Sequence, residues 1–253
     1  RVLDLITFKD FRKSVPQKLP MVVIMAGGLG SRLMPLTEKT PKPMLKLGKK
    51  PMLEIVLNNC IRAGLKEFYF AVNHLKDQII DYFGDGSKWG VDIKYLQEKT
   101  PLGTAGALKL LNLDDDKPIL VMNGDVLTNL NIANLINFHY KNSSLATICV
   151  REHIEKLAYG VVHLKNEKVH SIEEKPSFRN YVNAGIYLIE PNLLDFIQKG
   201  TPIDMPELLT LALESNMNIS ACPIHEYWLD VGQPETLVKA KKYWENKFVK
   251  NKK

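Results

Sequence analysis

The sequence of 253 residues lacks several features that would assign it to a large class of proteins. No apolar run approaches the roughly 20 residues that span a bilayer, and no signal-peptide pattern opens the chain. Low-complexity tracts are also missing, and the composition, 45% hydrophobic and 25% charged, is typical of soluble globular proteins. We therefore expect a globular protein that does not act in a membrane and is large enough to bury a substantial core.

Cysteine is scarce and shows no paired spacing. Cys60, Cys149 and Cys222 lie far apart without a CxxC motif, which disfavours a disulfide framework and a thiolate metal site. The six histidines show no HxxxH spacing, so we interpret them as ordinary surface or core residues. Isolated cysteines fit a reducing compartment, and we expect a cytoplasmic protein.

The net charge of +6 is confined to one end of the chain. Residues 239–253 hold seven lysines and one glutamate, and the remaining sequence has 27 basic and 27 acidic residues. A nucleic-acid-binding protein usually carries its basic residues on the folded recognition surface. The neutral body therefore argues against a nucleic-acid partner, and we interpret the basic end as a solvated helix end and tail.

The first residues differ in character from the rest. The chain begins at Arg1 rather than at a methionine, which indicates a processed chain or a piece of a longer one. Residues 1–19 are mixed in composition and end at Pro20, so we expect a linker or the tail of an absent upstream module there. Residues 20–253 are expected to form a single domain.

From residue 21 onward, strand-like and helix-like segments alternate. The predicted strands are residues 21–25, 67–73, 91–97 and 118–125, and the predicted helices are 52–63, 75–83 and 103–111. This βαβ order predicts parallel strands with right-handed crossovers. After about residue 144, strand-like segments with short connections predict antiparallel additions, with helices at 191–198, 205–214 and 234–247. The expected fold class is α/β: a Rossmann-like, mixed, mostly parallel sheet flanked by helices.

A glycine-rich turn, AGGLGSRL at 26–33, follows the first predicted strand. Glycines let the backbone approach a ligand closely and turn its N–H groups towards an anion. The turn is not a dinucleotide-binding fingerprint, because the third glycine of that motif would fall at Leu33, and no GK[ST] closes it as in a P-loop. Taken alone, the motif is equally consistent with a tight structural turn.

Two cations follow this turn. Arg32 comes directly after the three glycines of the turn and Ser31, and Lys42 stands between Pro41 and Pro43, which restrict the local backbone. An arginine and a lysine beside free backbone N–H groups suit a triphosphate, whose negative charge must be offset as a bond breaks.

The sequence around these residues resembles the signature of the sugar-1-phosphate nucleotidyltransferases, also known as nucleotide-sugar pyrophosphorylases. The similarity begins at GGLGSRLMPLTEKTPKPML and covers about residues 20–245. Further segments match in the expected order: YLQEKTPLGTAGAL (95–108), NGD (123–125), YGVV (159–162), EEKP (173–176), VNAGIYL (182–188) and YWLDVG (227–232). Each segment alone is weak evidence, and their joint order is what makes the pattern specific.

The resemblance implies a role for particular residues. Catalysis would use Arg32, Lys42 and Lys175, and the metal would be Mg²⁺ on Asp125 and Asp230. The nucleotide would be bound by Ala26, Gly27, Gly28, Gly30, Gln97, Gly103 and Thr104, with Gln97 and Gly103 at the base. The sugar would be bound by Gly160, Glu174 and Asn183. Two carboxylates that leave room for phosphate oxygens and water are the kind of ligand set that Mg²⁺ prefers.

The implied reaction joins a nucleoside triphosphate to a sugar 1-phosphate and releases pyrophosphate. PLGTAGAL and TPKPML are most similar to guanylyltransferases for hexose or heptose 1-phosphates, so we expect GTP and glucosamine 1-phosphate as substrates. Mannose or heptose 1-phosphate is the alternative, followed by thymidylyl or uridylyl transfer. The N-terminal extension also resembles bacterial members that carry an upstream pair of regulatory CBS modules.

A different class of function stays open at this point: a catalytically silent, nucleotide-sensing regulatory subunit with the same fold. Such relatives typically lose the metal-binding acids or the phosphate-binding cations. Their presence here favours an enzyme. The sequence leaves a homo-oligomer open.

Overall fold

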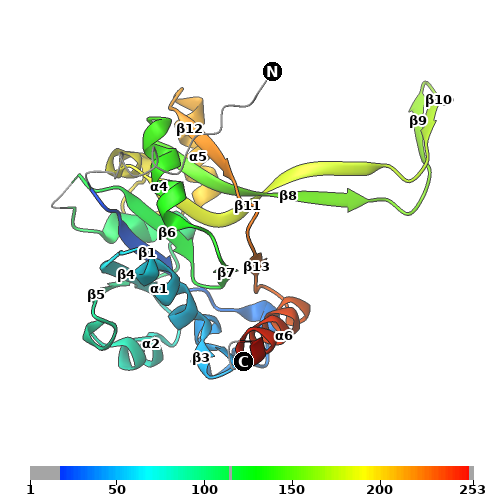
Figure 1. Ribbon diagram of the computed structural model, residues 1–253. Coiled ribbons are helices and arrows are strands. Elements are labelled where there is room, and N and C mark those ends of the chain that lie inside the picture. Colours follow the sequence, from blue (N-terminus) through cyan, green and yellow to red (C-terminus); the bar gives the residue numbers. More distant parts are fainter. Residues whose placement is uncertain (1–17, 114–115, 251–253) are drawn as a thin grey trace, which may run out of the picture.

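The computed structural model describes residues 18–113 and 116–250, with side chains as far as residue 245 (Figure 1). The predicted linker, residues 1–19, therefore lies almost wholly outside the described residues. The central sheet of the described chain has the strand order β12 (Ile219–Pro223), β8 (Ala146–Lys156), β11 (Ser177–Ile189), β6 (Ile119–Asn123), β1 (Met21–Met25), β4 (Glu67–Val72), β5 (Asp92–Gln97).

The sheet is mixed and mostly parallel, as predicted. Strand β1 pairs in parallel with β4 and β6, β4 with β5, and β12 with β8. Strand β11 is antiparallel to both of its neighbours, β6 and β8. The antiparallel additions expected after residue 144 are thereby confirmed. Strand β12 was not predicted, because its segment ISACP does not alternate clearly between apolar and polar residues.

Helices cover both faces of this sheet, and alternate residues of each strand supply the two cores. Val22 and Ile24 of β1 face one core, with α1 (Met52–Arg62), α2 (Lys76–Phe83) and α4 (Ile132–Lys141). Met21 and Val23 face the other, with α3 (Gly103–Gly106), the 3-10 turns η5 (Ala107–Leu110) and η6 (Pro191–Phe196), and α5 (Met205–Glu214). Strands buried on both faces read as continuous apolar runs, which is why the first strand was predictable.

A third, smaller core attaches the C-terminal helix α6 (Pro234–Lys250). Leu237 of α6 packs with Leu33, Met52 and Val231. The short strands β2 (Lys46–Leu47) and β3 (Lys50–Pro51) pair with each other beside this core. No described helix combines the length and apolar character needed to cross a membrane.

Two of the predicted helices are shorter or tighter than expected. Residues 103–110 form one α-helical turn followed by a 3-10 turn, and the backbone N–H groups of Ala105 and Gly106, in the first turn, donate to the carbonyl of Ile203. Residues 191–196 form a 3-10 helix. The predicted strand 118–125 ends at Asn123, where the N–H of Gly124 donates to the carbonyl of Met25 and turns the chain.

The outer halves of β8 and β11 leave the body as a two-stranded ribbon that ends in a hairpin (Figure 1). The hairpin consists of β9 (Val161–Lys165) and β10 (Lys168–Glu173). We define the arm as residues 151–182. Figure 1 shows the arm projecting far from the sheet and its helices, a direction that the sequence did not predict.

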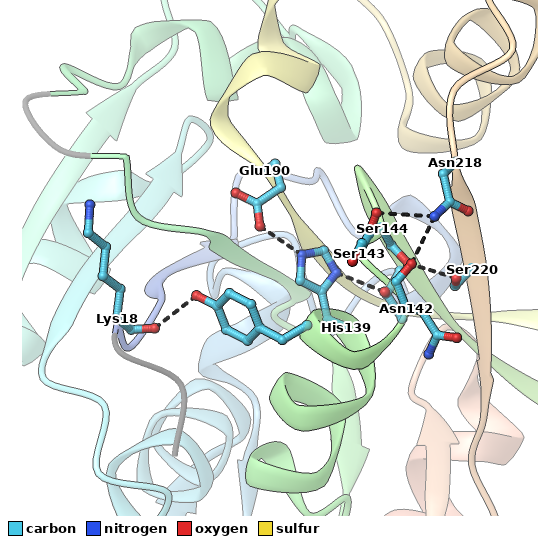
Figure 2. A network of polar contacts seen from close by, with 10 residues as sticks. Lys18, His139, Asn142, Ser143, Ser144, Glu190, Asn218 and Ser220 are labelled. Atoms are coloured by element: carbon cyan, nitrogen blue, oxygen red, sulfur yellow. Dashed lines mark hydrogen bonds and ion pairs between the residues drawn. The ribbon is translucent and has the colours of Figure 1, made fainter. Parts of the chain in front are cut away.

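One histidine is a core residue with both ring nitrogens engaged (Figure 2). His139 of α4 is 1% exposed, with Nδ1 2.8 Å from Thr147 Oγ1 and Nε2 3.0 Å from Glu190 Oε1. Beside it, Ser144 Oγ donates to Ser220 Oγ at 2.7 Å. These bonds join α4 to β8, β12 and the residue that follows β11, and they make His139 a core residue, one of the two environments expected for the histidines.

The aromatic cluster between α2 and the sheet offers a test of this core. Phe70 is fully buried and meets Phe83 edge to face, with ring centroids 5.1 Å apart. We expect Phe70→Ala to lower the free energy of unfolding by about 3–5 kcal/mol, because it leaves a cavity. Urea denaturation would measure this loss. Leu213→Ala is the control: this side chain is 55% exposed, so a comparable loss there would contradict the packing described.

Candidate active site

The parallel strands β1, β4, β5 and β6 end at one edge of the sheet, where a cleft of about 510 Å³ opens. Open parallel sheets usually bind ligands at this edge, because several loops converge there. Each of the four strands contributes residues that line the cleft directly after its last pairing: the 26–32 turn after β1, Asn73 after β4, Glu98 after β5 and Asp125 after β6. The edge of the sheet thus defines the candidate site.

The glycine-rich turn forms one wall of the cleft. Gly30 has φ +66°, and a Cβ built on it would lie 3.0 Å from Lys42 Cβ and from Thr37 Cγ2. Only glycine combines that backbone conformation with such close neighbours. The hydroxyl of Thr37, a buried residue, donates to the carbonyl of Gly30 at 2.8 Å and fixes the end of the turn. The following 3-10 turn, η2 (Ser31–Leu33), presents Arg32 to the cleft.

Lys42 lies at the first position of a 3-10 turn, η3 (Lys42–Met44), between two prolines. Its side chain is only 10% exposed and forms an ion pair and hydrogen bond with Asp125 Oδ2. Pro43 also lines the cleft. The proline-flanked segment therefore holds a buried cation against the acid that follows β6. It forms a 3-10 turn rather than the extended segment that the two prolines led us to expect.

Two short strands bring Asp125 and Asp230 together from distant parts of the sequence. Strands β7 (Val126–Thr128) and β13 (Trp228–Asp230) pair antiparallel, with Asp230 opposite Val126. The N–H of Val231 donates to the carbonyl of Asp125 at 3.1 Å. Both carboxylates line the cleft. Neither short strand was predicted, so this convergence could not be derived from local patterns.

The two carboxylates influence each other. Burial raises the pKa of Asp230, and the charge of Asp125 raises it further, whereas Lys42 and Arg32 lower it. Asp230 Oδ1 is buried and has no hydrogen-bond partner in the described chain. A Cβ built on Gly232 would lie 3.1 Å from this oxygen and 3.3 Å from Arg32 Nη2, so the arginine lies close to the acid. Within the described residues, no cluster of three or more histidine, cysteine or carboxylate ligands forms.

The opposite end of the cleft carries two polar side chains that sequence reasoning missed. A Cβ built on Gly27 would lie 3.1 Å from Glu98 Oε1 and 3.2 Å from Asn73 Cβ. Glu98 Oε2 accepts the N–H of Leu102 at 2.8 Å, and burial raises the pKa of this carboxyl group. Asn73 Nδ2 is buried without a hydrogen-bond partner among the described residues. Position after a parallel strand was the signal that could have found both residues.

Gly103 and Thr104 line the same cleft as Glu98. Gly103 has φ +76°, and a Cβ on it would collide with the carbonyl oxygen of Ile203 at 2.5 Å. The Thr104 N–H and hydroxyl both donate to Asp204 Oδ1, at 2.8 and 3.0 Å, and the hydroxyl accepts from the N–H of Met205 at 2.9 Å. The Thr104 side chain thus links this part of the cleft to the start of α5.

The structure brings together ten of the residues that the resemblance singled out. They are Ala26, Gly27, Gly28, Gly30, Arg32, Lys42, Gly103, Thr104, Asp125 and Asp230. Gln97 is not among the residues that line the cleft: its side chain is exposed, and its Oε1 accepts from Lys76 Nζ at 2.8 Å. Because successive residues of a strand point to opposite faces, Glu98 turns towards the cleft when Gln97 turns away.

The residues predicted to bind the sugar, and Lys175, which was predicted to be catalytic, lie elsewhere. Gly160, Glu174 and Lys175 are exposed on the arm and do not line the cleft. Asn183 lies where the ribbon leaves the sheet, and its amide is engaged locally: Nδ2 donates to the Tyr187 hydroxyl at 2.6 Å, and Oδ1 accepts the N–H of Gly185 at 2.9 Å. Their assignment to the sugar stays a prediction.

Comparison with known proteins now assigns the class. Residues 21–247 match the sequence model of the Nucleotidyl transferase family. The chain therefore belongs to the nucleotidyl transferase family.

Its relatives include sugar-phosphate enzymes. The chain is 37% identical over 222 residues to mannose-1-phosphate guanyltransferase of Yarrowia lipolytica, which covers 84% of this chain and 61% of the relative. It is 34% identical over 220 residues to mannose-1-phosphate guanylyltransferase catalytic subunit beta of Dictyostelium discoideum, with 84% and 61% covered. The chain thus spans about three fifths of the length of these curated relatives.

Solved structures agree on the fold. HddC from Yersinia pseudotuberculosis superposes with a TM-score of 0.71 at 26% identity, over 89% of this chain and all of that one. HddC complexed with GMP-PN gives a TM-score of 0.69 at 25% identity, with the same coverage. The mixed, mostly parallel sheet flanked by helices is the nucleotidyltransferase fold.

Burial of Asp230, together with the charge of Asp125 beside it, predicts a gain in stability when the charge of Asp230 is removed. Because the folded pKa of Asp230 is raised, its ionised form destabilises the fold, and this penalty disappears as the pH falls. We expect Asp230→Asn to raise the thermal midpoint by about 2 °C at pH 8 in metal-free buffer, and by less at pH 5. Asp195→Asn is the control, because that side chain is 82% exposed. A lower midpoint for Asp230→Asn at pH 8 would contradict the electrostatic account.

Proposed function

We propose that this protein transfers a nucleotidyl group from a nucleoside triphosphate to a sugar 1-phosphate and releases pyrophosphate. The observation that carries this proposal is the convergence, in one cleft, of a glycine-rich turn, two cations and two carboxylates. Family membership over residues 21–247 supports the same reaction class.

The cleft suits a triphosphate at the end of β1. The turn at 26–30 offers closely approachable backbone, and Arg32 and Lys42 supply positive charge beside it. In the proposed reaction, an oxygen of the sugar phosphate attacks the α-phosphorus in line, and the bond to the β-phosphate breaks. The attacking oxygen is already an anion, so no residue has to remove a proton. The chain's contribution is positioning and charge stabilisation.

Asp125 and Asp230 fit a magnesium ion. They supply oxygen ligands only, and the buried Asp230 Oδ1 has no hydrogen-bond partner in the described chain that would compete for it. Two protein carboxylates, with the remaining positions left to phosphate oxygens and water, suit Mg²⁺. When bound there, the ion would neutralise phosphate charge in the transition state. Lys42, ion-paired to Asp125, adds a fixed positive charge at the same point.

Guanine is the base that the far end of the cleft matches best. Guanine presents two adjacent donors, N1–H and N2–H, next to the acceptor O6. A carboxylate accepts two parallel donors, which fits Glu98, and the unpartnered Asn73 Nδ2 is a donor for O6. Uracil and thymine offer one N–H between two carbonyls, which a carboxylate would repel. The guanylyltransferase names of the relatives and the GMP-PN complex of HddC support this preference.

The sugar is proposed to be a hexose or heptose 1-phosphate. The names of the relatives support mannose 1-phosphate at least as well as glucosamine 1-phosphate, which is the substrate expected from the sequence. Glucosamine 1-phosphate would make the protein a counterpart of the guanylyltransferases of bacterial legionaminic acid synthesis. A small number of polar contacts would decide between these sugars.

The reaction is tested by pyrophosphate release with Mg²⁺. GTP, UTP, dTTP, CTP and ATP are each combined with mannose, glucosamine and heptose 1-phosphates. We expect turnover with GTP, and a loss of about 100-fold or more in Asp125→Asn, because transition-state charge is no longer balanced. Asp195→Asn, on the surface, is the matched control and should keep full activity. No release in any combination, from folded protein, would favour the silent regulatory subunit.

Base selection has its own test. We expect Glu98→Gln to lower kcat/KM for GTP by about 10- to 100-fold relative to UTP, since it loses one of two acceptors for the guanine edge. Gln97→Ala is the matched comparison from the neighbouring position, and the Gln97 side chain contacts Lys76 outside the cleft. Measuring kcat/KM with GTP and with UTP for both variants decides between the two residues. A larger loss of selectivity for GTP in Gln97→Ala would assign recognition of the base to Gln97, the residue first predicted.

A further inference from the structure

Two of the three cysteines, far apart in the sequence, become neighbours in the folded sheet. Cys149 lies in β8 and Cys222 in β12, and the parallel pairing of these strands sets the two residues directly opposite each other. Their side chains belong to the same core, Cys149 as a fully buried member and Cys222 as a partly buried one. The fold therefore creates a pair of thiols that cysteine spacing in the sequence did not indicate.

The spacing of the two strands suits a bond between these sulfurs. Neighbouring strands of a sheet lie about 4.8 Å apart, and the Cα atoms joined by a disulfide are roughly 4.4–6.8 Å apart. The Cβ atoms of a disulfide approach to about 3.8 Å, so the strands have to draw together slightly. Strand β12 is the outermost strand at its end of the sheet and pairs with β8 alone among the described strands. It can therefore make this small shift without breaking a second ladder of hydrogen bonds.

The two thiols are not equivalent. The pKa of Cys222 is lowered, chiefly because the thiol of Cys149 donates a hydrogen bond to its sulfur. The same hydrogen bond, together with burial, raises the pKa of Cys149 well above its usual range. The charge of Glu226 acts to raise the pKa of both. Because the thiolate is the form that reacts with oxidants, the more accessible Cys222 is the attacking sulfur, and Cys149 is placed beside it to resolve the product.

Cys60 provides a comparison within the same chain. It lies fully buried in α1, and burial raises the pKa of its thiol to about 12. Its Sγ is 3.6 Å from the thioether sulfur of Met122, which cannot form a disulfide. A buried thiol with a raised pKa stays protonated and is inert towards oxidants. The reactivity of the pair can therefore be measured against an unreactive cysteine.

We propose that Cys149 and Cys222 form a dithiol site that hydroperoxides oxidise reversibly to a disulfide. The site rests on the register of β8 and β12 and on the core that the two side chains share. Neither cysteine lines the cleft, so this property is independent of the proposed function. Disulfides that form and break in this way are the kind found in reducing compartments, where stable structural disulfides are rare.

The oxidation takes place in two steps. The Cys222 thiolate attacks one oxygen of the hydroperoxide and the O–O bond breaks. The alkoxide that leaves takes up a proton to become an alcohol, or water where the oxidant is hydrogen peroxide. The Cys222 sulfur loses two electrons and becomes a sulfenic acid. The Cys149 sulfur then attacks the Cys222 sulfur: an S–S bond forms, the S–O bond breaks, and the hydroxide leaves with the Cys149 proton as water. A dithiol reductant reverses the reaction by exchange and is itself oxidised to a disulfide.

The disulfide would lie at the root of the arm. Val150, next to Cys149, is the last residue of β8 that pairs with β12, and its carbonyl accepts the N–H of Ile224 at 2.9 Å. Arg151, the first residue of the arm, donates from Nη1 to the carbonyls of Ile224 and Glu226, both at 3.0 Å. Oxidation therefore adds a covalent link where β8 leaves the sheet, and it fixes the edge strand β12 to its partner.

The site is tested on the folded wild-type protein, first reduced and then freed of reductant. Hydrogen peroxide is added, its excess is removed with catalase, and the remaining free thiols are alkylated in denaturant and mapped by mass spectrometry. We expect the peptides of Cys149 and Cys222 to be joined, Cys60 to be alkylated, and dithiothreitol to restore all three thiols. Three free thiols, a disulfide between two copies of the chain, or oxidation of Cys60 to the same extent overturns the proposal.

Single substitutions separate the roles of the two sulfurs. Cys149→Ala should leave Cys222 as a sulfenic acid, which dimedone traps, whereas Cys222→Ala should leave Cys149 reduced. Cys60→Ala, which also replaces a buried cysteine, is the matched control and should form the disulfide as the wild type does. Circular dichroism checks the fold of each variant, and if one fails to fold, the peptide map of the wild type decides alone. Dimedone on Cys149 in Cys222→Ala would contradict the assignment of the attacking sulfur.

Hydrogen exchange tests the effect of the link on the sheet. The amides of β12 should exchange about tenfold more slowly in the oxidised protein, because the edge strand can no longer separate from β8. Strand β5, at the other edge of the same sheet, is the comparison and should exchange equally in both forms. Equal exchange of β12 in the two forms would contradict the link between the strands. All of these readouts stand whether or not the protein releases pyrophosphate.

Discussion

Two carboxylates in a half-buried cleft repel each other, and much of the surrounding structure serves to hold them there. Asp125 and Asp230 are brought together by the pairing of β7 with β13, and burial raises the pKa of Asp230 in addition to the effect of its neighbour. Lys42 and Arg32 oppose this effect, and both are fixed by short 3-10 turns rather than by flexible loops. The scaffold therefore maintains a site whose own charges destabilise the folded state, which is common where function needs concentrated charge.

The position of that site follows from the order of the strands. Strand β1 lies between β4 and β6, so the turn that follows it faces loops from both neighbours. The same edge receives Asn73 and Glu98 from β4 and β5, and Asp125 from β6. The antiparallel strand β11 then pairs with β6 on the side away from β1, and it leads into the arm. The proposed phosphate and base sites and the start of the arm therefore lie along one edge of the sheet, in the order of its strands.

Much of this could be predicted because it depends on local patterns. The apolar runs of β1, β4 and β6 and the glycine-rich turn have signatures that need no knowledge of the fold. Asp125 and Asp230 were found by resemblance alone, because only the unpredicted β7–β13 pairing brings them together. Gln97 and Glu98 differ by one position, and the face to which each points depends on where the strand ends. The arm was recognised as strands, but alternation fixes the face of a strand and not its direction in space.

The separate origins of the lining residues have a consequence for how such a protein changes over time. The end of the cleft that we propose for the base is built from the loops after β4 and β5, whereas the charged centre comes from the loops after β1 and β6 and from the end of β13. A substitution at Asn73 or Glu98 alters contacts at one end without touching Lys42, Asp125 or Asp230. Preference for a nucleotide can therefore drift while the reaction is preserved. One scaffold can in this way give rise to a lineage of enzymes that share chemistry and differ in their substrates.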